Sequence, residues 1–343
     1  MLEETYEVLA RKRNGLSKEV DGLRKLSKEA ELKGHWNSAK FDEKKVPIGA
    51  EDGSANHIKY RGFALYAVNA LALTYDGQVE EHSASDIGIL ELYRIEERLA
   101  LYRAIFEFKV ALKALSHAKI LLLDGSLSSD LGSPKHPGGD LSKAEKEEVL
   151  AFLPEVEKRL MKEQLVAEKL SEEFKEKRIE KTIYLEYLEY LACIFRLLEV
   201  GIDKVVGVSK TSTRSSLIDG LPDLAVYERM SRESGFSGLK HEPFSYKFRR
   251  RFPAYDEFFN SLVFTSCYAR LVDGKGVLLI EIPREVDDGR VINILEEMSA
   301  ISVDGYPYPL RKAHREVVIT SKDMRMISNS LGLIAKTGRE VLK

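Results

Sequence analysis

The sequence contains only two cysteines, Cys193 and Cys267, and they stand far apart. Without a CxxC pair, a disulfide framework and a thiolate zinc site are both disfavoured, and a reducing interior such as the cytoplasm is expected. Long apolar runs are missing too. The longest, Phe63 to Leu73, contains Asn69 and is too short to cross a bilayer. The N-terminus, Met1 to Glu4, lacks the basic-then-apolar order of a signal peptide.

A strong excess of charge is absent as well. The formal net charge is -2, so a nucleic-acid-binding role needs a local basic surface or a metal site. No P-loop motif occurs, which argues against ATP hydrolysis by this chain. At 343 residues, with 44% hydrophobic and 31% charged residues, the composition predicts a soluble globular protein of one large domain or two.

The tripeptide Asp-Gly-Ser occurs twice, each time after a short run typical of a strand. Residues 46–54 contain Asp52, and residues 119–126 contain Asp124. The glycine that follows each aspartate lets the chain turn sharply, so we expect each carboxylate where its strand stops. If the strands are neighbours, the two carboxylates can share a divalent metal, as in many phosphodiesterases. The alternative is that both are ordinary turn residues, because Asp-Gly is a frequent turn pair.

The first part of the chain predicts a helix followed by three strands. Residues 2 to about 33 have apolar residues at helical spacing among charges. Residues 46–52 and 61–75 indicate two strands. Asp76-Gly77 is a strong hairpin signal, so residues 78–85 are expected to form a third, antiparallel strand.

The middle of the chain alternates between helical and buried-strand patterns. Residues 87–117 predict a helix, and the continuous apolar run 120–123 predicts a strand buried on both faces. Residues 128–140 are rich in Ser, Gly and Pro and predict a loop. Ser142 and Glu145 form a capping signature that opens a helical insertion of about 142–200.

Residues 204–209 predict another strand, and 262–271 with 276–283 predict two more, while 287–343 is mostly helical. This order indicates an α/β fold of the ribonuclease H-like type, with a mixed sheet, flanking helices and a long helical insertion. A doubly wound fold is the main alternative, but helical crossovers would then join its early strands. We expect an N-terminal helical segment, 1–45, and one domain over 46–343.

Three further residues could take part in chemistry. Glu107 is a carboxylate in an apolar stretch, and burial of an unpaired carboxylate is costly. Lys210 follows the strand 204–209 and could hold a phosphate. His314 follows two prolines at the start of a basic helix, where it could orient water or bind metal. Each also has an ordinary interpretation as a solvated surface residue.

A basic segment with interleaved aromatic residues spans 240–251. Basic side chains contact phosphates and aromatic rings stack on unpaired bases, so this segment is a candidate DNA-binding surface. A solvated basic loop is the alternative. The residues expected to contact DNA are Lys247, Arg249, Arg250 and Arg251.

Together these residues resemble the NurA family of archaeal and bacterial nucleases, over about residues 46 to 320. Asp52-Gly53-Ser54 is similar to the first motif of the family, and Glu107 and Asp124 are similar to its second and third acidic positions. Lys210 is similar to a lysine that follows the fifth strand in this family. The segments Gly305-Tyr306-Pro307 and Ala313-His314, with Leu310 between them, resemble the C-terminal motif of the family.

The resemblance implies a ribonuclease H-like fold and DNA cleavage that depends on manganese, with magnesium as an alternative. It also implies a homodimer with a central channel that works with a HerA-type hexameric ATPase in DNA end resection. Asp52, Glu107 and Asp124 would then hold the metal. Lys210 and His314 would contact the phosphate or assist proton transfer.

Two other classes of function remain open at this point. A haloacid dehalogenase-like phosphatase also has an apolar strand ending in Asp, but it needs a second Asp two positions on, where this chain has Ser54 and Ser126. A non-catalytic DNA-binding protein could keep the fold and the basic segment without chemistry. Manganese-dependent DNA cleavage separates the nuclease from both.

Overall fold

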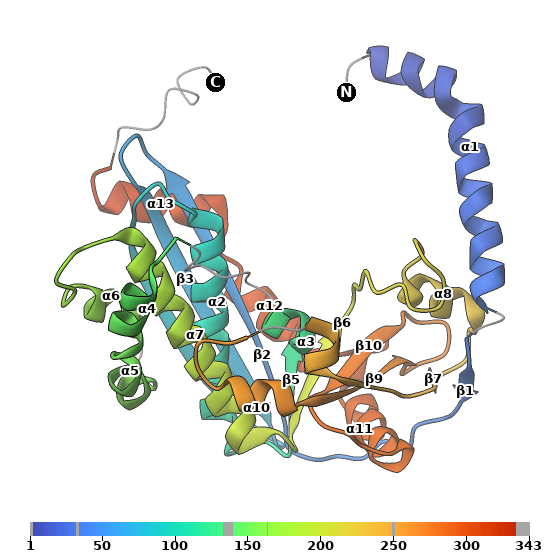
Figure 1. Cartoon of the computed structure of the whole chain (residues 1–343). Helices are drawn as coiled ribbons and strands as arrows, with labels where there is room; N and C mark the ends of the chain where they lie inside the picture. Colours follow the sequence, from blue (N-terminus) through green and yellow to red (C-terminus); the bar gives the residue numbers. More distant parts are fainter. Residues whose placement is uncertain (1–2, 32–33, 133–139, 163, 249–250, 334–343) are drawn as a thin grey trace.

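The computed structural model describes the chain except for residues 1–2, 32–33, 133–139, 163, 249–250 and 334–343 (Figure 1). Its centre is a large mixed β-sheet with helices on both faces. The strands of this sheet are β1 Trp36–Ser38, β2 Ile48–Lys59, β3 Ala64–Tyr75, β4 Val79–Leu90, β5 Ile120–Asp124, β6 Val205–Ser209, β7 Gly235–Ser237, β8 Lys240–Pro243, β9 Val263–Arg270 and β10 Leu278–Ile282. A separate two-stranded sheet pairs β11 Ser302–Val303 with β12 Tyr306–Pro307.

Helices precede, interrupt and follow the strands. They are α1 Glu3–Glu31, α2 Ile95–Leu115, α3 Leu127–Gly132, α4 Lys143–Leu150, α5 Leu153–Arg159, α6 Val166–Ser171, α7 Ile179–Gly201, α8 Asp223–Met230, α9 Phe244–Phe248, α10 Asp256–Ser261, α11 Asp288–Ala300, α12 Tyr308–Val317 and α13 Ser321–Ser330. None of the helices in the described part of the chain combines the length and the hydrophobicity that a membrane-spanning segment needs.

The order of strands across the large sheet is β1-β7-β9-β10-β6-β5-β2-β3-β4, and β8 pairs with β9. The predicted hairpin at Asp76-Gly77 joins β3 to β4, and Gly77 has a positive φ of 72° that the turn requires. β2 is antiparallel to β3 but parallel to β5, which is parallel to β6. The expected mixed sheet is therefore present, with the segment α4 to α7 inserted between β5 and β6.

The two faces of the central strands are buried against different helices. Leu121 and Leu123 of β5 belong to the core that contains α2 and α7. Ile120 and Leu122 alternate with them and belong to the core that contains α11 and Leu310 of α12. This alternation confirms that 120–123 is a strand buried on both faces, and it places α2 and α12 on opposite sides of the sheet.

The expectation that a strand stops at Asp52 is wrong, because β2 continues to Lys59. β2 pairs with β3 along its whole length, from Ile48 opposite Tyr75 to Lys59 opposite Ala64. Its parallel pairing with β5 ends earlier, at Glu51 opposite Leu123. Asp52 therefore lies inside a strand, at the level where the neighbouring strand β5 finishes.

Two other boundaries also differ from the sequence prediction. Residues 87–90 extend β4 rather than starting a helix, because they pair with the first residues of β3, Ala64 to Ala67. Part of the expected loop 128–140 is helical, since α3 spans Leu127–Gly132 and buries Leu127 and Leu131. The predicted capping box is confirmed at α4, where Ser142 accepts a hydrogen bond from the backbone N–H of Glu145.

The predicted N-terminal helix is confirmed as α1. Figure 1 shows it projecting from the body of the molecule near α8. Tyr6, Leu9, Leu16 and Val20 are exposed along it.

Candidate metal centre

Asp52, Asp124 and His314 meet at the carboxyl end of β5. The parallel register pairs Glu51 with Leu123, so the next residues, Asp52 and Asp124, lie side by side on adjacent strands. His314 comes from α12, and its Nδ1 lies 2.7 Å from Oδ2 of Asp52. One potential ligand atom from each of the three residues lies within 4.8 Å of the others. Three residues separated by up to 262 positions in the sequence thus form one compact group.

The packing of α12 explains why His314 points to this group. Pro309 is buried in the first turn of α12, where a proline is tolerated because its missing N–H needs no helical partner. Leu310, Ala313 and Val317 follow at helical spacing and are also buried. This apolar side anchors the helix on β2 and β3. His314 follows the buried Ala313 and reaches Asp52 while its side chain stays 57% exposed.

Lys210 and Tyr306 flank Asp124. Lys210 directly follows β6, and its Nζ lies 3.5 Å from Oδ2 of Asp124. The Tyr306 hydroxyl donates to the other carboxylate oxygen across 3.4 Å. The Lys210 Nζ also lies 4.3 Å from the centroid of the Tyr306 ring, a cation–π distance. Burial raises the pKa of Asp124, while Lys210 acts to lower it.

Tyr306 is a residue that the sequence analysis quoted in a motif but did not name as a site residue. Burial raises its pKa, and the charge of Asp124 raises it further. The phenol therefore stays protonated and acts as a hydrogen-bond donor. Its position between Gly305 and Pro307, at the entry to the helix that carries His314, was the signal that could have identified it.

Glu107 does not join the group of three. It lies on the opposite face of the sheet, on α2, where a Cβ built on Gly53 would come within 2.7 Å of its Cγ and Oε1. Arg103 pairs with it across 3.3 Å. Burial raises the pKa of Glu107 to about 7, and Arg103 opposes that rise. Asp52 acts on Glu107 electrostatically, so the two carboxylates are close enough to influence each other across β2.

Two further buried carboxylates near Glu107 were missed from the sequence. Glu51 is 3% exposed, and its Oε2 has no hydrogen-bond partner among the described residues. Burial raises its pKa well above the ordinary value, and Glu107 and Asp52 add to the rise. Burial likewise raises the pKa of Asp130 to about 7. Glu51 could have been found from its place beside Asp52, because adjacent strand residues point to opposite faces.

Glu281 holds the turn that follows Asp124. It is fully buried on β10 and accepts hydrogen bonds from the Ser126 hydroxyl at 2.6 Å and the Ser128 hydroxyl at 2.7 Å. Arg214 donates to the same carboxylate and also to Ser128. A buried carboxylate satisfied by several donors fixes the backbone that presents Asp124.

The predicted DNA-binding segment is described only in part. Lys247 belongs to α9, and Arg249 and Arg250 lie outside the described residues. Arg251 is described and exposed. The DNA-binding role of these four residues stays a prediction.

The model of the NurA domain family matches residues 46–319. This chain belongs to the NurA family. The match covers the group of three, Glu107, Lys210 and Tyr306, and it confirms the resemblance drawn from the motifs.

Several DNA repair nucleases align with this chain over nearly its whole length. The probable DNA double-strand break repair nuclease NurA of Methanocaldococcus jannaschii is 25% identical, with 98% of this chain and 91% of that protein covered. The DNA double-strand break repair nuclease NurA of Saccharolobus solfataricus is also 25% identical, with 97% and 96% covered. The crystal structure of the NurA nuclease from Sulfolobus solfataricus superposes with a TM-score of 0.79, at 25% identity and with 97% of each chain covered.

A crystal structure of NurA bound to dAMP and manganese matches with a TM-score of 0.72, covering 100% of both chains. The sequences are 16% identical, so this match shows a shared fold.

Proposed function

We propose that this chain is a metal-dependent nuclease that cuts DNA phosphodiester bonds in double-strand break repair. The observation that carries the proposal is the group of Asp52, Asp124 and His314 in a chain of the NurA family. The names of the relatives, which are DNA repair nucleases, support the choice of DNA as substrate.

The strand order supports the more specific proposal of a ribonuclease H-like core. Along β4-β3-β2-β5-β6, three antiparallel strands are followed by two that run parallel to β2. In such a core the first strand lies in the centre and carries the first acidic residue. Here that strand is β2, and it carries Asp52 next to Asp124 of β5.

The residues present fit a divalent metal of the manganese or magnesium type. Two carboxylates and one imidazole offer ligand atoms within 4.8 Å of one another, and carboxylates and water are the donors that such ions prefer. Asp52 and Asp124 would hold the metal. Glu107, the third predicted ligand, lies outside this group on the α2 side of β2, so its role as a ligand is supported by the family resemblance and by its electrostatic coupling to Asp52 and Asp124. When bound, the metal would make water a stronger nucleophile and stabilise negative charge on the leaving oxygen.

The remaining residues have roles that follow from their contacts. Lys210 is 44% exposed beside Asp124, so its ammonium group can reach a non-bridging phosphate oxygen and offset charge there. Tyr306 keeps the Asp124 carboxylate oriented by donating to it. A carboxylate only accepts hydrogen bonds, so Asp52 fixes the proton of His314 on Nδ1. The Nε2 of His314 is then available to accept a proton or a ligand bond.

The oligomer and the partner belong to the same proposal. A homodimer and a HerA-type hexameric ATPase are implied by the family, and the absence of a P-loop in this sequence means that any ATP-driven DNA movement needs another chain.

The test is digestion of linear DNA by the purified protein with manganese, with magnesium and with a chelator. We expect cleavage with manganese, weaker or equal cleavage with magnesium, and none with the chelator. DNA that is bound but left intact with both metals would favour a non-catalytic DNA-binding protein and contradict the proposal.

A further inference from the structure

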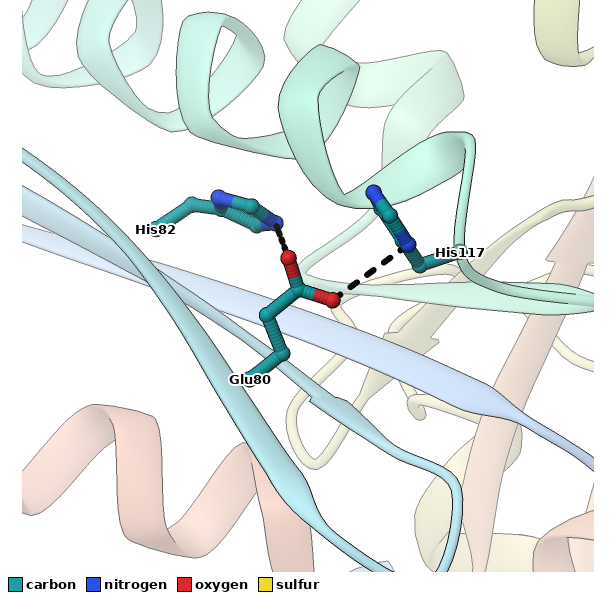
Figure 2. A group of neighbouring side chains, drawn as sticks. All are labelled: Glu80, His82 and His117. Atoms are coloured by element: carbon teal, nitrogen blue, oxygen red, sulfur yellow. Dashed lines mark ion pairs between the residues drawn. The ribbon is translucent and has the colours of Figure 1, made fainter.

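A second group of metal-ligand side chains lies away from the group formed by Asp52, Asp124 and His314, which is called the Asp52 group below. Figure 2 shows Glu80 and His82 on β4 and His117 in the turn after α2. The Glu80 carboxylate pairs with both rings, at 3.5 Å to Nε2 of His82 and 3.3 Å to Nδ1 of His117. One ligand atom from each residue lies within 4.8 Å of the others.

The two groups are on opposite faces of the sheet. His82 is paired with Ala72, which belongs to the core on the α2 side. Glu51 faces the same α2 side. Asp52, the next residue in the strand, faces the other side, where it contacts His314 of α12. β4 is the edge strand of the sheet, so the second group lies at its margin.

Local structure explains why these three side chains converge. Glu80 and His82 are two positions apart in a strand and therefore share a face. The small side chain of Ala72, opposite His82, leaves space for the imidazole ring. The backbone N–H of His117 donates to Ala114 at 3.0 Å, which fixes the turn at the carboxyl end of α2.

The spacing suits a tetrahedral metal. Zinc binds nitrogen and carboxylate oxygen at about 2.0–2.1 Å, so two ligands of one tetrahedral ion are about 3.3–3.4 Å apart. Nε2 of His82 lies 3.5 Å from Oε1 of Glu80, and Nδ1 of His117 lies 3.3 Å from Oε2, so each ring is close to that spacing from one carboxylate oxygen.

A separate observation points to a missing ligand at this place. The Nε2 atom of His82 is buried, and apart from its ion pair with Glu80 at 3.5 Å it has no hydrogen-bond partner among the described residues. The Thr74 hydroxyl is in the same condition, in a side chain 2% exposed, and Thr74 lies directly opposite Glu80 on the same face. Buried polar atoms almost always have a partner, so two such atoms on one face of adjacent strands indicate that a polar species belongs there.

We propose that Glu80, His82 and His117 bind a zinc ion, with water completing the coordination. Two imidazoles and one carboxylate form a donor set that favours zinc over manganese or magnesium. Glu80 is 49% and His117 is 52% exposed, so solvent reaches the open position. Zinc there ties the edge strand β4 to the end of α2, and its binding stabilises the folded chain.

The experiment is a calorimetric zinc titration of tag-free, full-length protein, run in parallel on Asp124→Ala, in which the carboxylate-rich site has lost a ligand. We expect one zinc ion per chain, and a rise in melting temperature on adding zinc. His82→Ala and His117→Ala should each weaken zinc binding at least tenfold and remove that rise. His117 is half exposed, so His117→Ala is the variant expected to fold like the parent.

His57→Ala is the matched control. His57 pairs with Glu96 across 3.5 Å, but it belongs to neither of the two three-ligand groups found among the described residues. Its zinc affinity should equal that of the parent. Any one of three results would overturn the proposal. The first is that the parent protein does not bind zinc, and the second is that the His82→Ala, His117→Ala double variant binds zinc as tightly as the parent. The third is that Asp124→Ala, with both histidines intact, loses zinc binding.

Discussion

Asp124 has a different environment at each of its two oxygens. One oxygen faces the Lys210 ammonium at 3.5 Å and the other accepts from Tyr306 at 3.4 Å. Both contacts are long, so neither neighbour saturates the carboxylate. Burial raises the pKa of this group, whereas a bound cation would lower it. These contacts orient the carboxylate and leave its lone pairs available to a metal.

Removing either aspartate should abolish cleavage and preserve the fold. Asp52→Ala removes the whole carboxylate, and Asp124→Asn replaces a charged carboxylate with a neutral amide that binds such ions more weakly, so we expect DNA cleavage to fall by more than about a hundredfold. Loss of outer-shell partners alone costs about 10–100-fold at metal sites. Cleavage of labelled linear DNA with manganese measures the effect, and circular dichroism checks the fold. Full activity in either folded variant would show that the residue does not hold the metal.

The sequence predicted the main residues of this site one by one, but it could not predict which distant side chains contact them. Asp52, Asp124 and Lys210 each stand beside an apolar strand pattern, which is a local signal. Glu281 gives no such signal, because its role depends on Ser126 and Ser128, more than 150 positions away. The contact of Asp52 with His314 spans 262 positions and depends on how α12 packs on the sheet.

At the scale of elements, the course of β2 decides how the site is built. Local turn chemistry predicted that the strand would stop at Asp52-Gly53. Instead, the antiparallel partner β3 supplies hydrogen bonds through Lys59, and this pairing overrides the local signal. Gly53 therefore serves a different purpose from a turn. It leaves space on the α2 face of the sheet, and Glu107 fills that space.

Gly53→Ala tests whether this close approach matters for cleavage. The new Cβ would lie 2.7 Å from Cγ and Oε1 of Glu107, so the carboxylate must move. Because the clash includes Cγ of a largely buried side chain, moving the tip alone does not relieve it, and we expect the free energy of unfolding to fall by about 1–3 kcal/mol. If Glu107 holds the metal, cleavage should fall at least about tenfold, since ligand position controls metal sites.

Gly62→Ala is the control for that variant, because nothing lies within 4 Å of a Cβ built there. It should leave cleavage unchanged. Unchanged cleavage in Gly53→Ala as well would indicate that the position of Glu107 is not important for the reaction, and would weaken its assignment as a ligand.

At the scale of the whole molecule, the net charge of -2 makes DNA binding depend on local surfaces. The segment 240–251 concentrates basic residues, so replacing Arg249, Arg250 and Arg251 together with Ser should weaken DNA binding. It should also flatten the salt dependence, by about one unit of slope for each DNA phosphate that the variant no longer neutralises. Fluorescence anisotropy at several salt concentrations, with divalent metal absent to prevent cleavage, measures the slope. An unchanged slope would indicate a solvated loop.

The last prediction concerns assembly. A nuclease without a P-loop can trim only the DNA ends that diffuse to it, whereas an ATP-driven translocase can feed duplex into its site. The exposed apolar residues of α1, among them Leu9 and Leu16, also offer a surface for another chain. We therefore expect a dimer in light scattering, and a larger complex with a HerA-type ATPase that resects DNA when ATP is supplied.

Two controls separate assembly from catalysis. Asp124→Asn should still dimerise and bind the ATPase, because Asp124 lies at the end of β5 within the sheet, whereas Leu9→Ser with Leu16→Ser should lose the complex and keep manganese-dependent cleavage. A monomer that neither binds the ATPase nor gains activity from it would remove the assembly proposal. Cleavage by that monomer would leave the nuclease proposal intact, since the Asp52 group is built from one chain.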